Sequence, residues 1–145
     1  MKLTAERVFA ALPVIDKIIG EKRPLTVKGA YRMARMHAKL VPEFRLLEER
    51  RDAIIGAYDY KAVPEGAKKG AEPVPTVPPH KVDEFMGMWT QVLREEIEVE
   101  LLPIPLEMLG PADAESPITA FEMLALGDLL IDDSDQPPLA LPKAA

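Results

Sequence analysis

Four glutamates, Glu95, Glu96, Glu98 and Glu100, lie within six residues and form the densest group of side chains that could do chemistry. Carboxylates can hold a divalent cation or exchange a proton with a substrate when they converge on one point. The last three alternate with apolar residues, which is the period of a β-strand. On a strand they share one face but stand about 6.5 to 7 Å apart. We therefore favour a solvated strand face over a metal site, with a surface for a basic partner as a further possibility.

Four cations, Lys28, Arg32, Arg35 and Lys39, form a second group, which we call the basic stripe. Their spacing of four, three and four residues places them on one face of a helix. Three interpretations stay open: a solvated helix face, a docking strip for acidic protein, or a nucleic-acid site. The acidic protein would be the chain's own C-terminal half or a neighbouring subunit. Nucleic acid is least favoured, because four phosphate contacts give modest, salt-sensitive affinity and no aromatic stacking platform accompanies them.

Other catalytic or metal-binding patterns are missing from the sequence. The two histidines have no metal-ligand spacing; we expect His37 to be a packed, hydrogen-bonded core residue and His80 to lie on the surface. The absence of cysteine excludes a disulfide framework, a thiolate metal site and a cysteine nucleophile. Phosphate-binding glycine loops, nucleophile elbows and zinc-protease motifs are also lacking. We expect a protein that is not an enzyme and needs no cofactor or metal.

Charge is divided unevenly along the chain. Residues 1–81 carry 16 Lys and Arg against 10 Asp and Glu, whereas residues 82–145 carry 2 against 14. Regions of opposite sign attract each other, within one molecule or between neighbours. The acidic half also opposes an approach to nucleic acid, so we expect protein partners and a possible homo-oligomer. The N-terminal segment has charges that break every apolar run before it reaches the length of a membrane span, so we expect no membrane contact.

Periodicity predicts the elements that position these residues. Helices are expected from Thr4 to Gly20, with a kink or a break at Pro13, from Val27 to about Tyr58, and from Val82. A last helix is expected with Ser116 as its cap and Pro117 in its first position. A strand is expected over 96–101, ended by Pro103 and Pro105. Residues 60–80, rich in proline, form a long loop, and residues 132–145 form a flexible tail.

Two expectations concern burial and pairing. The helix from Val27 has an apolar arc of more than half its circumference, which predicts that it is covered on two sides. Its members are Val27, Ala30, Tyr31, Met33, Ala34, Met36, His37, Ala38, Leu40 and Val41. In the last helix, Ile118, Phe121, Leu124 and either Leu129 or Leu130 should point inward. The strand at 96–101 needs a partner, and the candidates are "YKAV" at 60–63 or a second chain.

These elements predict a mainly α protein of the α+β class. We expect a helical hairpin or bundle of about four helices with one short strand or a two-stranded ribbon, forming a single domain over residues 1–131.

The order of the segments "RPLTVKGAYRMARMHAKLVPEF", "VDEFMGMWTQVL" and "EEIEVELLPIPLEML", between a short leading helix and a small closing one, resembles small bacteriophage proteins of uncharacterised function. Those proteins are encoded among virion structural and assembly genes. The resemblance covers residues 4–131 and supplies no site residues. It implies a minor virion component or assembly factor, located in the virion or the host cytoplasm, that acts through protein association.

Two other functions remain possible from the sequence. One is a small acidic inhibitor of a host defence or nucleic-acid enzyme, which would offer the face of Glu96, Glu98 and Glu100 to a basic cleft. The other, less favoured, is a hydrolase or nuclease that uses scattered carboxylates.

Overall fold

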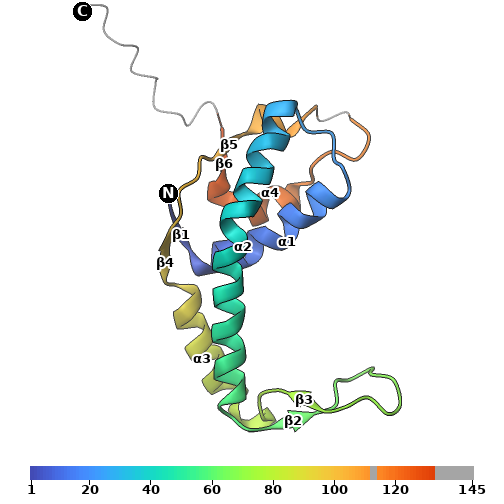
Figure 1. The fold of residues 1–145 in the computed structure, drawn as a ribbon, viewed down its shortest axis with the longest axis vertical. Helices are drawn as coiled ribbons and strands as arrows, with labels where there is room; N and C mark the ends of the chain where they lie inside the picture. Colours follow the sequence, from blue (N-terminus) through green and yellow to red (C-terminus); the bar gives the residue numbers. More distant parts are fainter. Residues whose placement is uncertain (112–113, 133–145) are drawn as a thin grey trace, which may run out of the picture.

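A computed structural model describes residues 1–111 and 114–132 and shows the predicted fold class, four α-helices with small two-stranded sheets (Figure 1). The α-helices are α1 (Ala5–Gly20), α2 (Val27–Gly56), α3 (Val82–Leu93) and α4 (Ala120–Leu126). The strands are β1 (Lys2–Thr4), β2 (Lys61–Ala62), β3 (Val74–Pro75), β4 (Glu96–Glu98), β5 (Ile104–Pro105) and β6 (Leu130–Ile131). Short 3₁₀ helices are η1 (Pro79–Lys81), η2 (Leu106–Leu109) and η3 (Gly127–Leu129). The predicted tail lies outside the described residues, apart from Asp132.

Helix α1 supplies much of the core. Thr4 caps it by accepting a hydrogen bond from the Arg7 N–H, and Val8, Ile15 and Ile18 on its inner face are completely buried. The sequence predicted a kink or a break at Pro13. The break does not occur, because α1 continues through Pro13. Pro13 is exposed, so water can reach the carbonyl that the proline leaves without its helical donor.

Helix α2 extends over 30 residues, as the sequence predicted, and begins at a Thr26 cap. Its buried face is narrower than expected and contains Gly29, Met33, Met36, Leu40 and Leu47. The expected cover on a second side is not present among the described residues. Five residues of the predicted apolar arc are exposed: Val27, Ala30, Tyr31, Ala34 and Ala38. Three of these five residues are alanines and a fourth, Tyr31, carries a hydroxyl group. Exposing this side of α2 to water therefore costs little free energy.

The predicted strand finds its partner in a segment that the sequence analysis did not consider. Strand β4 pairs antiparallel with β1, with Leu3 opposite Ile97. The segment "YKAV" instead contributes β2 to a separate hairpin with β3, inside the predicted long loop. The pairing of β4 therefore requires no second chain.

The end of the described chain folds over α1 and the start of α2. Strands β5 and β6 pair in parallel, so Pro105 forms part of a strand and does not merely end one. Helix α4 begins after Thr119, three residues later than predicted, because Ser116 has a left-handed φ of 57° that an N-cap residue does not adopt. Ile118 and Leu129 are buried as expected, but Phe121 and Leu124 are exposed, which corrects the prediction that they point inward.

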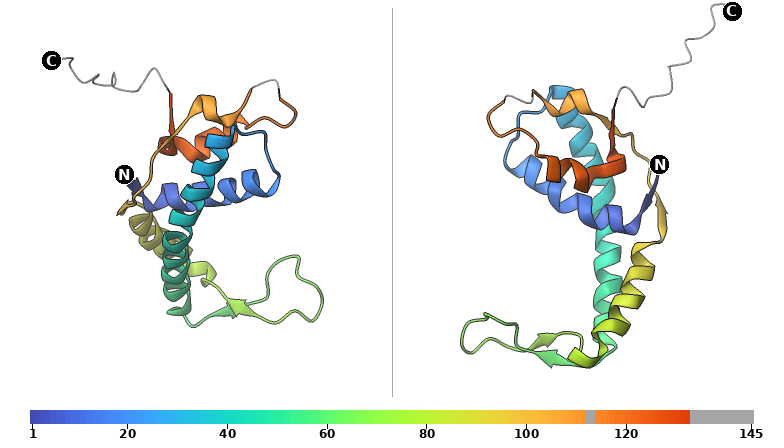
Figure 2. Two further views of the ribbon diagram at one scale, coloured as in Figure 1. Left: turned by 45° about the horizontal axis from the view of Figure 1, so that its top comes forward. Right: turned by 180° about the vertical axis from the view of Figure 1, so that it is seen from behind.

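The molecule is elongated, with α2 along most of its length (Figures 1 and 2). At one end α1 contacts both α2 and α4. At the other end α3 lies beside the second half of α2, and the β2–β3 hairpin projects from the tip. An aromatic cluster joins the two parts: the Phe9 ring stacks on Phe44 at 4.7 Å between centroids and meets Trp89 edge-on at 5.5 Å.

Candidate functional site

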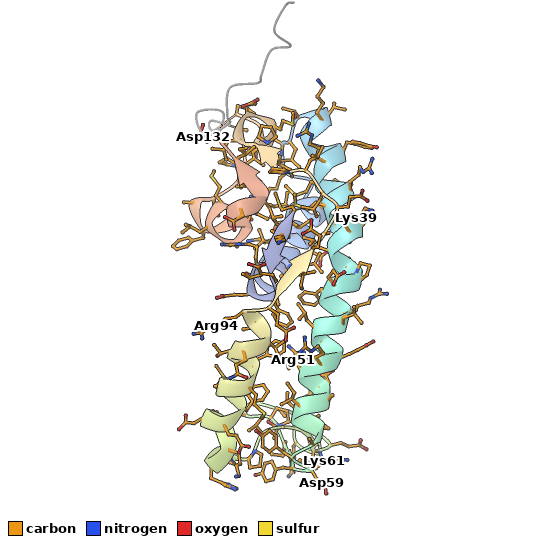
Figure 3. All side chains as sticks on the ribbon, turned by 90° about the vertical axis from the view of Figure 1, so that its left-hand side faces the viewer. Lys39, Arg51, Asp59, Lys61, Arg94 and Asp132 are labelled. Carbon is orange, nitrogen blue, oxygen red and sulfur yellow. The ribbon has the colours of Figure 1, made fainter. Side chains whose placement is uncertain are left out.

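A surface groove of about 500 Å³ lies between the first half of α2 and the segment that follows β4. Figure 3 looks onto this side of the molecule, with Lys39 labelled on α2. The lining residues are Met1, Tyr31, Arg32, Arg35, Met36, Lys39, Glu100, Leu101 and Leu102. The groove therefore brings together three of the four residues of the basic stripe and Glu100, which lies beyond the end of β4 because the strand predicted over 96–101 covers only Glu96–Glu98.

The wall formed by α2 carries the cations. Arg32 is half-buried and its Nη1 donates a hydrogen bond of 3.2 Å to the Pro103 carbonyl, which fixes this side chain across the groove. Arg35 Nη1 donates a 3.2 Å hydrogen bond to the Tyr31 hydroxyl, and its guanidinium lies 5.8 Å from the centre of the Tyr31 ring. Lys39 is exposed and has no ion-pair partner among residues 1–111 and 114–132.

The opposite wall is mainly apolar. Leu102 is 69% exposed, and Tyr31 across from it on α2 is 62% exposed. Leu101 is half-buried at the base of the wall, and Glu100 adds one carboxylate. Large apolar side chains next to cations are typical of surfaces that bind other proteins, where tyrosine and arginine carry much of the binding energy.

The strand glutamates do not converge. Glu96, Glu98 and Glu100 are all exposed, as the sequence predicted, with Glu96 and Glu98 on β4 outside the lining of the groove. The Glu98 carboxylate lies 3.2 Å from the amino group of Met1. No cluster of three or more potential metal ligands occurs in the described part of the chain. The three carboxylates are therefore exposed and spread along the segment instead of meeting at one point.

The remaining predicted residues lie apart from the groove. Lys28 is exposed near the start of α2 and does not line it. His37 is not a core residue: its side chain is 34% exposed and its Nε2 lies 2.5 Å from Asp16 Oδ1, linking α1 to α2. The expected hydrogen bond exists, but at the rim of the helix interface.

A buried ion pair that the sequence analysis missed joins the two oppositely charged halves. Arg23 Nη1 lies 3.0 Å from Glu122 Oε1, and both side chains are 7% exposed. Burial alone would raise the pKa of Glu122, but hydrogen bonds from Thr119 and Arg23 lower it below the ordinary value of 4.5. The available signal was the spacing Thr119-x-x-Glu122, which forms a capping box.

A second contact between the halves lies at the far end of β4. Arg50 on α2 makes two hydrogen bonds to the Glu95 carboxylate, at 2.6 and 3.1 Å. The hydrogen bond from Arg50 lowers the pKa of Glu95. Part of the charge asymmetry is therefore satisfied inside the molecule, by residues outside the basic stripe.

A smaller hollow of about 250 Å³ occurs beside α4 and is lined mainly by apolar side chains, among them Leu106, Leu109, Ile118 and Met123. Next to this hollow α4 exposes Phe121 and Leu124, at 84% and 72%. Among the described residues, the lining of this hollow includes no charged side chain, unlike the lining of the groove on α2.

Comparison with family models, curated proteins and solved structures gave no match. Within residues 1–111 and 114–132, no helix combines the length and the apolar character needed to cross a bilayer.

Proposed function

We propose that this protein is not an enzyme and acts by binding another protein through the groove on α2. The observation that carries the proposal is the joining of exposed cations and exposed apolar side chains in one depression, with Arg35 and Lys39 beside Tyr31 and Leu102. This combination fits a protein segment that carries both carboxylates and aliphatic side chains. The biological setting that we propose, a minor virion or assembly protein of a bacteriophage, is supported by the sequence resemblance alone.

The groove favours an acidic protein segment over nucleic acid. The apolar wall formed by Leu101 and Leu102 has no counterpart in a phosphate backbone, and Glu100 would repel one. An acidic segment with leucines could place its carboxylates toward α2 and its leucines toward the apolar wall.

The test uses a fluorescein-labelled peptide of about twelve residues with alternating Asp and Leu, and a matched peptide with Lys in place of Asp. Anisotropy titrations should show binding of the acidic peptide that weakens as salt rises. Reversal of two cations, Arg35→Glu with Lys39→Glu, should weaken it about tenfold or more. The control is Arg45→Glu, on an exposed α2 position that does not line the groove. Equal affinity for both peptides, or equal loss in the control, would refute the proposal.

The second candidate is the acidic inhibitor, which is favoured by the exposure of Glu96, Glu98 and Glu100. Its partner would be a basic cleft of a host enzyme. Charge reversal of Glu96, Glu98 and Glu100 would then abolish inhibition while the fold persists, whereas association through the groove depends more on Arg35 and Lys39.

A further inference from the structure

The groove on α2 is matched in chemistry by a part of the same chain that lies outside the described residues. Residues 133–145, which we call the C-terminal segment, have the sequence "DSDQPPLALPKAA". The segment holds carboxylates at Asp133 and Asp135 and aliphatic side chains at Leu139 and Leu141. These are the two kinds of side chain that the cations and the apolar wall of the groove would accept.

The C-terminal segment starts close to one wall of the groove. Strand β6 pairs in parallel with β5, so that Ile131 lies opposite Pro105. Pro105 is three residues from Leu102 in the apolar wall, which is about 10 Å of extended chain. Pro103, between them, accepts the hydrogen bond that Arg32 donates from α2. The described residues therefore lead the segment out beside the wall that it would have to cover.

The C-terminal segment is also long enough to return to the groove. Because β6 runs parallel to β5, the chain leaves Ile131 in the direction away from Leu102 and has to reverse. Residues 133–135, Asp-Ser-Asp, are of the types that favour turns. Leu139 follows the last described residue by seven positions, a span of up to about 23 Å in an extended chain. This exceeds the return to Leu102 and leaves length for the turn.

We infer that the C-terminal segment occupies the groove on α2 of its own chain. Its carboxylates then face Arg35 and Lys39, which have no ion-pair partner within residues 1–111 and 114–132. Its two leucines are two positions apart and project to the same side of an extended chain, so both can face the apolar wall. There they cover Leu102 and Tyr31, the two most exposed large side chains of the groove.

The hollow beside α4 is the competing site for this segment, because it is also apolar. Its lining contains no charged side chain in the part of the chain that the structure describes, so it offers no cation to Asp133 and Asp135. Charge complementarity therefore favours the groove.

This inference rests on the proposed function, because it takes the groove to bind acidic segments with leucines, and it adds regulation of that site. A segment held in the groove by its own chain competes with an external partner. The apparent affinity for the partner is then reduced in proportion to the fraction of molecules whose groove is open. Removing the leucines of the segment should therefore strengthen partner binding.

The first measurement locates the segment by paramagnetic broadening of NMR signals in the full chain. The sequence contains no cysteine, so Ala144→Cys provides a single site for a nitroxide label. In an isotope-labelled sample, the nitroxide should broaden the amide signals of residues 35–39 and of Leu102, and leave those around Phe121 unaffected. Broadening confined to the surroundings of Phe121, or none at all, would overturn the inference.

A mixed sample separates the chain's own groove from that of a second copy. It combines spin-labelled chain without isotope and isotope-labelled chain without nitroxide, and its groove amides should stay sharp. Broadening as strong as in the first sample would place the segment in a neighbouring molecule and contradict the inference.

The second measurement is an anisotropy titration with the fluorescein-labelled acidic peptide used to test the proposed function. Leu139→Ser with Leu141→Ser should bind this peptide about threefold or more tightly than wild type, and should abolish the broadening when combined with the spin label. The control, Ala140→Ser with Ala145→Ser, adds the same two hydroxyl groups but keeps both leucines. It should behave as wild type in both measurements.

The two proposals fail in different ways. If wild type binds the acidic peptide, but the leucine variant binds it no more tightly and the groove amides stay sharp, the inference is wrong and the proposed function stands. If the groove amides broaden, but neither wild type nor the leucine variant binds the acidic peptide, the segment lies in the groove and the proposed function is wrong.

Discussion

Glu122 is the residue whose environment differs most from that of an ordinary surface carboxylate. Its side chain is buried, its carboxylate accepts hydrogen bonds from the Thr119 backbone N–H and from Arg23, and its own backbone N–H donates to the Thr119 hydroxyl. These contacts fix the start of α4 against the turn between α1 and α2.

A substitution at Glu122 should therefore destabilise the protein. We expect Glu122→Ala to lower the free energy of unfolding by about 2 to 4 kcal/mol, because it removes the capping box and leaves the Arg23 guanidinium buried without this partner. Urea denaturation monitored by circular dichroism measures the change. A matched control is Glu115→Ala, an exposed glutamate just before α4, which should change stability by less than about 0.5 kcal/mol.

Glu122 also determines how the stability of the protein changes with pH. Because the pKa of Glu122 is lower in the folded protein than in the unfolded chain, its contribution to stability is complete above the ordinary value of 4.5. That contribution disappears as pH falls below 4.5 toward the folded pKa. Melting curves between pH 7 and pH 3 should show a smaller acid-induced loss in Glu122→Gln than in wild type; equal losses would contradict this assignment.

At the scale of the elements, sequence periodicity predicted the extent of the long helices better than it predicted which face of α2 is buried. The predicted helix from Thr4 to Gly20 agrees with α1, and the extent of α2 was predicted to within a few residues. Strand β1 was missed because three residues are too few to show alternation before the helix begins.

The start of α4 was misplaced for a different reason. Two start signals compete there, Ser116-Pro117 and Thr119-x-x-Glu122, and the sequence alone does not rank them. The buried contact between Glu122 and Arg23 decides for the second, and it depends on a residue about a hundred positions away. The groove could not be predicted for a similar reason. The basic stripe was visible in the sequence, but the apolar wall of the groove comes from Leu101 and Leu102, which are far from the stripe in the sequence.

Glycines on two helices give a paired prediction. A side chain at Gly29 on α2 would overlap the Met108 backbone carbonyl, because η2 approaches the helix closely there. We expect Gly29→Ala to destabilise the protein by about 1 to 3 kcal/mol. Gly87 on α3 has open space around it, so Gly87→Ala should stabilise by about 0.5 to 1 kcal/mol. Chemical denaturation of both variants provides the test, and a loss of stability in Gly87→Ala would contradict the described environment of α3.

At the scale of the whole molecule, the groove on α2 and the hollow beside α4 are lined by different kinds of side chain. The groove on α2 combines leucines with arginine, lysine and tyrosine, whereas the described lining of the hollow beside α4 contains no charged side chain. The two halves of the chain, opposite in charge, also meet through Arg23–Glu122 and Arg50–Glu95. Arg35 and Lys39 have no ion-pair partner in the described chain and stay available to a partner.

The most direct measurement of this account is backbone amide hydrogen exchange of the full chain, with and without the acidic probe peptide at saturation. If the groove is the binding surface, exchange should slow in the segment around Leu101 and Leu102, which lies outside the strands, and the α4 surface should be unaffected. Slowing confined to α4 around Phe121 and Leu124, or no change anywhere, would contradict the assignment of the groove on α2 as the protein-binding site.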